Sequence, residues 1–332
     1  MDHFWNNKKV LVTGADGFIG SHLTERLVEQ GAQVRAFVYY NSFGRWGWLD
    51  ETSADLIKNI EVFSGDIRDS YRVMEAVKGE QIVFHLASLI AIPYSYHAPD
   101  SYVQTNVGGT LNVLNACRSQ GVERLVHTST SEVYGTAQYV PIDEKHPLQG
   151  QSPYSATKIG ADMLAESFHR SFNLPLVIVR PFNTYGPRQS ARAVIPTIIS
   201  QLLSDVRHIK LGDLTPTRDF TYVSDTVSGF LSAAVCDRAL GQTINLGSGQ
   251  EISVGDLAQT IMEVTGIEAE VICENDRLRP PKSEVNRLLC NASRAKEWAG
   301  WTPRKSLEEG LVETSDWVKK NLGCFKPNLY ST

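Results

Sequence analysis

The sequence predicts an α/β fold in which a doubly wound parallel sheet precedes a smaller mixed α/β C-terminal region. Through the first half of the chain, β-rich runs alternate with amphipathic helical runs, which is typical of a parallel sheet covered by helices. A glycine-rich turn separates the first strand from the first helix. After about Pro181 this rhythm breaks into shorter elements, and we therefore expect a second, smaller region there.

The elements follow from hydrophobic periodicity. Strands are expected at 8–14, 32–39, 60–66, 81–88, 124–130 and 175–181. Helices are expected between them, because apolar residues recur every three or four positions and most runs end at Gly or Asn, at 21–31, 70–79, 102–121 and 155–172. In the C-terminal region, short strands at 208–213, 243–249 and 269–274 mix with helices at 194–205, 253–266, 293–301 and 306–321.

Composition narrows the class of protein. The 332 residues are 42% hydrophobic and 21% charged, with a formal net charge of -5 and no basic run, so a nucleic-acid surface is not expected. The scattered cysteines form no metal-type pair, which favours reduced thiols in a cytoplasmic protein, and no metal site is expected. The N-terminus lacks a signal-peptide layout and no run is long enough to span a membrane, so no membrane partner is expected.

The turn "VLVTGADGFIGSHL" places Gly14, Gly17 and Gly20 between the first strand and the first helix. Glycines let the backbone N–H groups of the helix start approach a pyrophosphate. An ordinary strand-to-helix turn is the alternative, but the strand–helix–strand context favours a dinucleotide site of the Rossmann type. No acid ends the second strand at 38–41, so NAD and NADP are both left open. Asp66 could read an adenine edge or cap the next helix.

The stretch "SPYSATK" places Tyr154 and Lys158 four residues apart, on one helix face. A nearby ammonium ion favours the phenolate form of a tyrosine, so Lys158 is expected to lower the pKa of Tyr154. Such a tyrosine can accept the proton of a sugar hydroxyl. The alternative is a surface Tyr and Lys pair without a catalytic role, but the glycine turn upstream favours a catalytic pair.

Together, "TGADGFIG", "HLAS", "QTNVGGT", "TSTSEVYG", "YSATK" and "RPFNTYGP" resemble the extended short-chain dehydrogenase/reductase family of nucleotide-sugar enzymes over about 8–322. The resemblance implies that 1–180 bind NAD, with NADP not excluded, and carry the catalytic residues. It implies that 181–332 mainly bind the nucleotide sugar, with some chain crossing back to the sheet. The resemblance also implies that the cofactor is tightly bound and recycled. The residues implied to bind it are Gly14, Gly17, Phe18, Ile19, Gly20, Tyr39, Asp66, Ile67, Leu86, Ala87, Ser88, Asn106, Ser129, Tyr154, Lys158 and Pro181.

The strand end "LVHTSTSEVYG" carries a carboxylate, Glu132, at a site where desolvation is costly. Within the family, Ser129 or Thr130 matches the hydroxyl that orients substrate. The run Thr130-Ser131-Glu132 resembles that of 4,6-dehydratases, especially GDP-mannose 4,6-dehydratases, and also occurs in UDP-glucuronate decarboxylases. Oxidation at C4 of the sugar acidifies the hydrogen at C5, and Glu132 is the expected base, with Ser131 organising the leaving hydroxyl. The alternative is that Glu132 caps a turn.

Later loops supply residues for a nucleotide diphosphate. The resemblance assigns this role to Asn183, Arg188, Arg218, Arg279 and Glu284. Arginine suits the task because its planar fork binds phosphate bidentately. A solvated surface position is the usual alternative for a single arginine.

Two further stretches resemble narrower groups within the family. The segment 279–301 is similar to the end of GDP-mannose dehydratases. The segment "FVYYNSFGRWGWLDE" is similar to the dehydratase of bacterial legionaminic acid synthesis, which implies GDP- or UDP-linked N-acetylglucosamine as substrate. Trp46 and Trp48 in this loop could cover cofactor, substrate or a neighbouring subunit, or plug their own domain.

The leading interpretation is an NAD(P)-dependent 4,6-dehydratase. The alternatives are a UDP-glucuronate decarboxylase, a nucleotide-sugar 4-epimerase, and a catalytically inactive NAD(P)-binding regulatory protein. The helices at 103–119 and 154–172 would, in this family, pair with their symmetry mates, so a homodimer or tetramer is expected.

Overall fold

The computed structural model describes residues 4–204, 208–327 and 329–330. A seven-stranded parallel sheet lies at its centre, with the strand order β11-β6-β5-β4-β1-β2-β3. Its strands are β1 (Lys9–Thr13), β2 (Gln33–Tyr39), β3 (Ile60–Gly65), β4 (Ile82–His85), β5 (Arg124–Thr128), β6 (Leu176–Pro181) and β11 (Thr243–Leu246). The reversal of strand order between β1 and β4 is the switch point at which doubly wound sheets bind ligands. The predicted fold class is confirmed.

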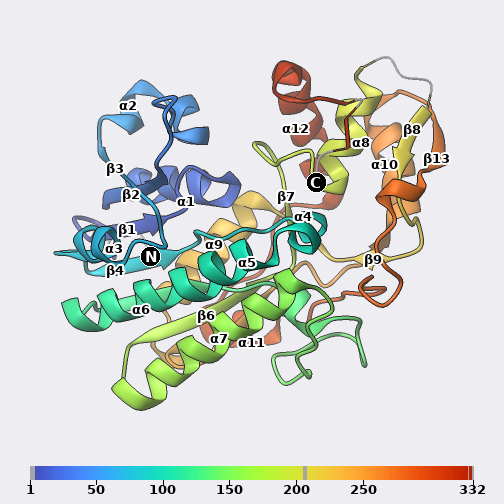
Figure 1. Ribbon diagram of the computed structural model, residues 1–332. Helices are drawn as coiled ribbons and strands as arrows, with labels where there is room; N and C mark the ends of the chain where they lie inside the picture. Colours follow the sequence, from blue (N-terminus) through green and yellow to red (C-terminus); the bar gives the residue numbers. More distant parts are fainter. Residues whose placement is uncertain (1–3, 205–207, 328, 331–332) are drawn as a thin grey trace.

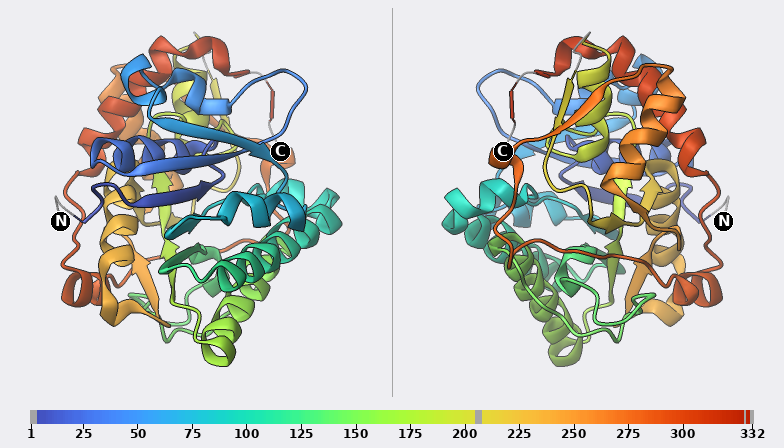
Figure 2. Two further views of the ribbon diagram at one scale, coloured as in Figure 1. Left: turned by 90° about the vertical axis from the view of Figure 1, so that its left-hand side faces the viewer. Right: turned by 90° about the vertical axis from the view of Figure 1, so that its right-hand side faces the viewer.

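Helices cover both faces of this sheet (Figures 1 and 2). One face carries α3 (Ser70–Val77), α6 (Gly109–Gln120) and α7 (Pro153–Phe172). The other carries α1 (Phe18–Glu29), α9 (Val223–Val235) and α11 (Ser293–Ala299). Short helical segments complete this part of the chain: η1 (Gly47–Glu51), α2 (Ala54–Ile57), α4 (Ile92–His97), α5 (Pro99–Tyr102), the π-helical η2 (Val103–Gly108), the 3₁₀ turn η3 (Ser131–Tyr134) and η4 (Asp237–Ala239).

The C-terminal region is built from three two-stranded sheets and their helices. The strand pairs are β7 (Asn183–Tyr185) with β10 (Phe220–Tyr222), β9 (Thr217–Arg218) with β12 (Ile252–Ser253), and β8 (His208–Leu211) with β13 (Glu270–Cys273). Its helices are α8 (Val194–Leu202), α10 (Val254–Thr265) and α12 (Leu307–Lys320), with 3₁₀ turns η5 (Asn275–Arg277) and η6 (Leu322–Cys324). Asp205, the last residue of the helix predicted at 194–205, lies outside the described residues.

The observed layout differs from the predicted one in several short elements and in two longer features of the main sheet. The strand expected at 243–249 does not belong to the C-terminal region, because β11 pairs with β6 as the edge of the main sheet. The helix α9 was not predicted; ten of its thirteen residues are buried, and Ser, Thr, Gly and Asp among them interrupt the apolar pattern. Local caps explain other boundaries: Ser152 and Ser155 form a capping box that starts α7.

Candidate active site

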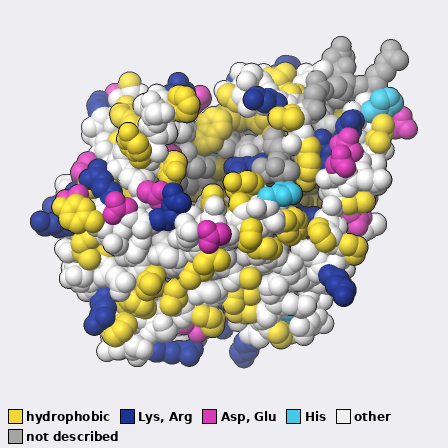
Figure 3. Space-filling view, viewed as in Figure 1, with side chains coloured by type: hydrophobic (Ala, Val, Ile, Leu, Met, Phe, Trp, Pro, Cys, Tyr) yellow, Lys and Arg dark blue, Asp and Glu magenta, His cyan; other side chains and the backbone are white. Residues whose placement is uncertain are grey.

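A cavity of about 1000 Å³ opens at the carboxyl ends of the sheet strands, between the sheet and the C-terminal region. The face drawn in Figure 3 is hollowed in its upper half. All but one of the predicted site residues line this cavity. The exception is Asn106, which is buried under its wall and hydrogen-bonds both backbone groups of Leu89. Asn106 therefore shapes the wall at Leu89 without facing the cavity itself.

The glycine turn forms one end of the cavity. A Cβ at Gly20 would lie 2.0 Å from the carbonyl oxygen of Gly14, and a Cβ at Gly14 would lie 2.8 Å from the backbone nitrogen of Ala87. The turn therefore requires glycine. No side chain caps the N-terminus of α1 at Gly17, so the backbone N–H groups there are available to an anion.

The adenosine end contains a carboxylate that the sequence reasoning missed. Asp16 lines the cavity, and its Oδ2 accepts a hydrogen bond of 3.1 Å from the backbone nitrogen of Tyr39, the last residue of β2. A carboxylate from the glycine turn thus lies beside the end of β2, where the sequence itself has no acid. Burial raises the pKa of Asp16. The sequence does show this carboxylate, as the Asp in "TGADG", but the glycine spacing alone gives it no role.

Asp66 follows β3 and lines the cavity near Tyr39. It does not cap the next helix, because Asp69 accepts the hydrogen bonds of the first turn of α3. Both carboxylate oxygens of Asp66 instead accept from the guanidinium of Arg68. The capping alternative for Asp66 is therefore wrong.

The tryptophan loop packs on its own chain. The Trp48 backbone nitrogen donates to the carbonyl of Asp16 at 3.0 Å, and the Trp48 ring meets that of Trp317 in α12 at 5.3 Å between centroids. Trp48 also lines the cavity beside the glycine turn, while Trp46 is 40% exposed. The loop therefore ties the cofactor end of the cavity to the C-terminal region.

Tyr154 and Lys158 project from the first turns of α7 beneath the end of β5. The Nζ of Lys158 donates to the carbonyl oxygen of Thr128 at 2.6 Å, and burial lowers the pKa of Lys158 to about 8. Burial raises the pKa of Tyr154, while its hydrogen bond with the hydroxyl of Thr130 opposes the rise. The expectation that Lys158 would lower the pKa of Tyr154 is wrong here, because burial dominates.

Thr130 and Ser129 have different roles at the end of β5. The Thr130 hydroxyl hydrogen-bonds Tyr154, whereas the Ser129 hydroxyl donates to Asp162 at 2.8 Å. Of the two hydroxyls that the resemblance offered, Thr130 is therefore the one beside the tyrosine. Ser131 is buried and lines the same part of the cavity.

Glu132 is a carboxylate with 9% exposure in the cavity wall. Thr130, not Glu132, caps the 3₁₀ turn, because the Thr130 Oγ1 accepts from the Glu132 backbone nitrogen. Among the described residues, the Glu132 carboxylate has no hydrogen-bond or ion-pair partner, although its charge raises the pKa of Tyr154 and acts on Arg218. The turn-capping alternative for its side chain is therefore wrong.

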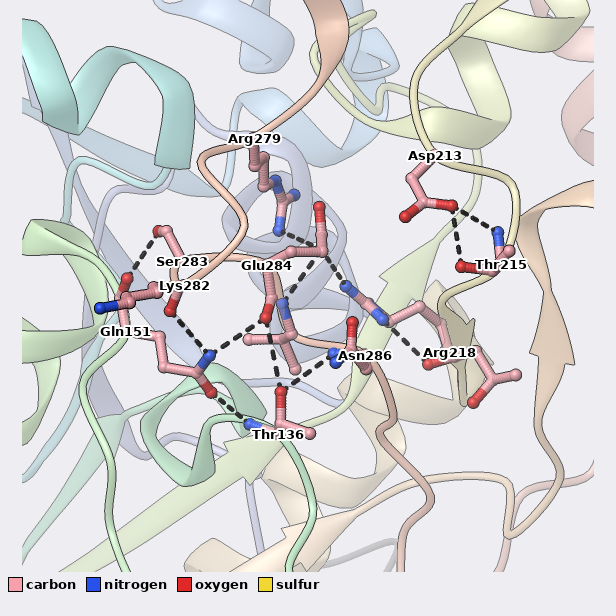
Figure 4. A network of polar contacts seen from close by, with 12 residues as sticks. Thr136, Gln151, Asp213, Thr215, Arg218, Arg279, Lys282, Ser283, Glu284 and Asn286 are labelled. Carbon is pink, nitrogen blue, oxygen red and sulfur yellow. Dashed lines mark hydrogen bonds and ion pairs between the residues drawn. The ribbon is translucent and has the colours of Figure 1, made fainter.

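The opposite end of the cavity is basic. Figure 4 shows Arg218 and Arg279 converging on Glu284, whose Oε1 lies 3.1 Å from Arg218 Nη2 and 3.3 Å from Arg279 Nη1. Gln151, just before α7, donates to the backbone carbonyls of Lys282 and Glu284. The segment 279–284 is thereby fixed to the residues just before α7, and Arg218 and Arg279 both line the cavity.

Of the two remaining predicted substrate residues, Arg188 is ion-paired within the chain and Asn183 has an unpaired amide oxygen. Both Nη atoms of Arg188 pair with Glu25 of α1, at 3.0 and 2.8 Å, so its charge is already matched. Asn183 follows Phe182 on the cavity wall, and its Oδ1 is buried without a hydrogen-bond partner among the described residues. An unpaired buried amide oxygen indicates a missing donor, which a ligand could supply.

In the described part of the chain, no group of three or more His, Cys, Asp or Glu side chains could hold a metal ion. No helix in the same part is long and apolar enough to cross a membrane.

The chain is similar to known nucleotide-sugar enzymes over nearly its full length. The family model described as GDP-mannose 4,6 dehydratase matches residues 11–314. A dTDP-glucose 4,6-dehydratase of Streptomyces antibioticus is 31% identical, over 96% of this chain and 94% of that protein. A UDP-glucose 4-epimerase of Mycolicibacterium smegmatis is 33% identical, over 94% and 98%.

A solved structure shares the fold closely. The UDP-glucuronic acid 4-epimerase of Bacillus cereus, solved with UDP-glucuronic acid and NAD, is 28% identical, with a TM-score of 0.85 over 94% of this chain and 99% of that one. Dehydratases and epimerases resemble the chain about equally, so overall likeness places it in their common family. The chain therefore belongs to the GDP-mannose 4,6 dehydratase family, within the NAD-dependent nucleotide-sugar epimerases and dehydratases of the extended short-chain dehydrogenase/reductases.

Proposed function

We propose that the protein is a nucleotide-sugar 4,6-dehydratase. The observation that carries the proposal is Glu132, a buried carboxylate without a partner among the described residues, lining the cavity close enough to act on Tyr154. A buried, unpaired charge is costly, so its retention favours a task in the reaction. Proton removal at C5 requires such a base, whereas simple inversion at C4 does not.

NAD suits the residues at the other end of the cavity. Only glycine fits at Gly14 and Gly20, and the uncapped start of α1 offers N–H groups to a pyrophosphate. Asp16, in the glycine turn beside the end of β2, favours a free ribose hydroxyl over a 2′-phosphate, because two anions there would repel. Bound NAD would supply a reversible hydride acceptor and a positively charged ring, and it would remain bound through successive turnovers.

The chain's own residues account for the proton transfers. Tyr154 accepts the proton of the C4 hydroxyl as a phenolate, a form that the Lys158 ammonium one helical turn away and the positively charged ring of bound NAD would favour against burial, with Thr130 hydrogen-bonded to its oxygen. The new C4 ketone acidifies C5, and Glu132 removes the C5 proton. Glu132 passes this proton to the C6 hydroxyl, which Ser131 organises and which leaves as water, forming a C5–C6 double bond. The hydride removed from C4 would then be restored at C6, and Tyr154 would return its proton to C5. Product is the 4-keto-6-deoxy sugar, with no net oxidation.

Arg218, Arg279 and Asn183 would hold the nucleotide diphosphate, with Glu284 spacing the two guanidinium groups. The resemblance of the 37–51 loop to dehydratases of legionaminic acid synthesis favours N-acetylglucosamine linked to GDP or UDP as substrate. On that basis we place the enzyme in bacterial nonulosonic acid synthesis.

A C4 epimerase is the second candidate, because epimerases stand among the relatives at similar identity. A UDP-glucuronate decarboxylase is a third, since it shares the Thr-Ser-Glu pattern. A non-catalytic NAD-binding regulator would bind nicotinamide without turnover, and it has no evident need for a buried unpaired Glu132.

We further propose a homodimer, or a tetramer built from it, that pairs α6 and α7 with their symmetry mates. Large apolar side chains on these helices are exposed: Leu111 at 37%, Met163 at 43% and Phe172 at 44%. Figure 3 shows hydrophobic side chains gathered over the lower front, where Figure 1 places α6 and α7. Light scattering of the purified protein tests this, and a monomer would contradict it.

The function is tested by incubating the purified protein with GDP- and UDP-linked N-acetylglucosamine. We expect the mass of one of the two to fall by one water, without added reductant or oxidant. Unchanged mass with inversion at C4 would identify an epimerase. A separate incubation with UDP-glucuronic acid tests the third candidate, and loss of carbon dioxide from it would identify a decarboxylase.

A further inference from the structure

Asp162 lies on α7, one helical turn beyond Lys158, and is fully buried. Its carboxylate accepts hydrogen bonds from two other elements. Oδ1 accepts from His127 Nε2 of β5 at 3.2 Å, and Oδ2 accepts from Ser129 at 2.8 Å. Oδ2 also accepts from Nε and Nη2 of Arg180 in β6, at 3.1 and 2.9 Å. Asp162 thus joins the catalytic helix to two central strands.

These contacts surround the backbone that binds Lys158. His127 and Ser129 flank Thr128, whose carbonyl oxygen accepts from the Lys158 ammonium. Fixing the two flanking side chains to Asp162 therefore fixes the acceptor of Lys158. Thr130, which hydrogen-bonds Tyr154, is the next residue along the chain.

Among the ionisable groups described around Lys158, Asp162 is the one whose negative charge stabilises its ammonium form. His85 of β4 and His127 are buried, and burial lowers the pKa of each, so both are neutral. Arg180 is cationic but is already paired with Asp162 and bonded to the Tyr134 hydroxyl. Burial raises the pKa of Tyr154, so Tyr154 adds no anionic charge beside Lys158 in the absence of the positively charged ring of bound NAD.

We propose that Asp162 is a positioning residue for the reaction, which holds Lys158 as an ammonium ion against burial and anchors the strand end that binds it. This inference rests on the proposed function for one assumption, that Tyr154 and Lys158 act on a sugar hydroxyl. Burial acts to lower the pKa of Lys158, and the charge of Asp162 acts in the opposite direction. Without that carboxylate, Lys158 would lose its proton at lower pH.

The first test does not depend on turnover. Competitive acetylation by acetic anhydride, read by mass spectrometry, reports the fraction of neutral Lys158 amine at each pH. In Asp162→Asn we expect the midpoint of Lys158 labelling to fall by about one pH unit or more. Asp225→Asn is the matched control, because Asp225 is also buried but accepts from the backbone of Arg304 and Lys305. Its Lys158 profile should match that of the unmodified protein.

Removing one partner of a buried ion pair can destabilise the fold. Asp162→Asn leaves the guanidinium of Arg180 without its partner, and the double variant Asp162→Asn/Arg180→Met removes that cation as well. The double variant replaces the single one if thermal unfolding shows that Asp162→Asn is not folded. The same downward shift is expected in it. An unchanged Lys158 midpoint in a folded variant overturns the proposal.

The second test follows reduction of the bound nicotinamide on mixing with nucleotide sugar. The alkaline limit of this first step should move to lower pH in the variant, in parallel with the labelling midpoint. A fall in rate without a change in the pH limit would mean that Asp162 only supports the fold, and would overturn the proposal. If the unmodified protein reduces no nicotinamide yet the labelling midpoint shifts, the proposed function fails while the role of Asp162 in holding Lys158 charged stands.

Discussion

The Nζ of Lys158 lies 2.6 Å from the carbonyl oxygen of Thr128, in an interior where burial lowers the pKa of Lys158 to about 8. Burial raises the pKa of Tyr154, one helical turn away, and its phenolate form would therefore depend on the Lys158 ammonium ion acting together with the positively charged ring of bound NAD. Activity that depends on the ammonium form is present below the pKa of Lys158 and is lost as the pH rises through it. We therefore predict that the rate of the first turnover falls on the alkaline side, with a midpoint near 8. A rate that stays constant up to the pKa of an ordinary lysine, about 10.4, would contradict this.

Tyr154→Phe should lower turnover by a factor on the order of 100 or more. The change removes one hydroxyl from a 7%-exposed ring, so packing and cofactor content should be retained. Steady-state rates and the NAD content of the purified protein check both points. Tyr139→Phe is a control, because Tyr139 is exposed, does not line the cavity, and its hydroxyl donates to Asp143. Near-normal turnover in a folded Tyr154→Phe protein would remove Tyr154 from the mechanism.

The paired arginines give a prediction on substrate affinity. Arg279→Ala should raise KM for the nucleotide sugar by roughly 10- to 100-fold, since one charge-assisted hydrogen bond to the diphosphate is lost. Its effect on kcat should be smaller, because Arg279 is at the end of the cavity away from the glycine turn. Arg287→Ala is the matched control: Arg287 pairs with Glu251 and does not line the cavity. Equal KM values in the two variants would exclude Arg279 from substrate binding.

The glycine turn gives a prediction on the cofactor. Gly20→Ala places a Cβ 2.0 Å from the carbonyl oxygen of Gly14, so the turn must shift. We expect the protein to lose its bound NAD, with a destabilisation of about 1–3 kcal/mol. At Gly108, the nearest atom to an added Cβ is 3.9 Å away, so Gly108→Ala should keep its NAD. Cofactor release on denaturation and thermal unfolding measure both. Full NAD occupancy in Gly20→Ala would contradict the assignment of the turn.

Sequence patterns were sufficient for the elements whose periodicity is strong. The strands from 8 to 181 and the helices between them appear where alternation of apolar runs predicts them. In α9, buried polar and glycine residues interrupt the apolar pattern, so its periodicity is weak. The strand β11 is separated by more than sixty residues from its partner β6, so local order along the chain does not indicate this pairing. Such long-range pairing is set by tertiary packing.

The site shows the same division. The glycines, Tyr154, Lys158 and Glu132 lie in motifs whose spacing carries chemistry, and the structure brings them to one cavity. Asn106 also lies in a motif, yet its amide is occupied by the backbone of Leu89. Asp16 and Asp162 could not be identified from spacing, because their roles depend on partners that are adjacent only after folding.

Glu132→Gln separates the steps of the proposed reaction. The amide cannot remove the C5 proton, but Tyr154 and Lys158 remain, so oxidation at C4 should proceed and elimination should stall. Reduced nicotinamide should therefore accumulate on the enzyme after substrate is added, as seen by its absorbance. Glu144→Gln is a control, because Glu144 is also shielded from solvent but bonds Asn245 and Arg294 away from the cavity lining. Normal dehydration by Glu132→Gln would show that another group is the base.

The central claim is that the hydrogen taken from C4 returns to C6 as water is lost. The direct measurement uses nucleotide sugar deuterated at C4, with the position of the label in the product determined by NMR. A 4,6-dehydratase is expected to give a 4-keto-6-deoxy sugar with deuterium at C6, and in heavy water to exchange the proton at C5. Deuterium found at C4 of the product, with or without inversion there, would contradict the account.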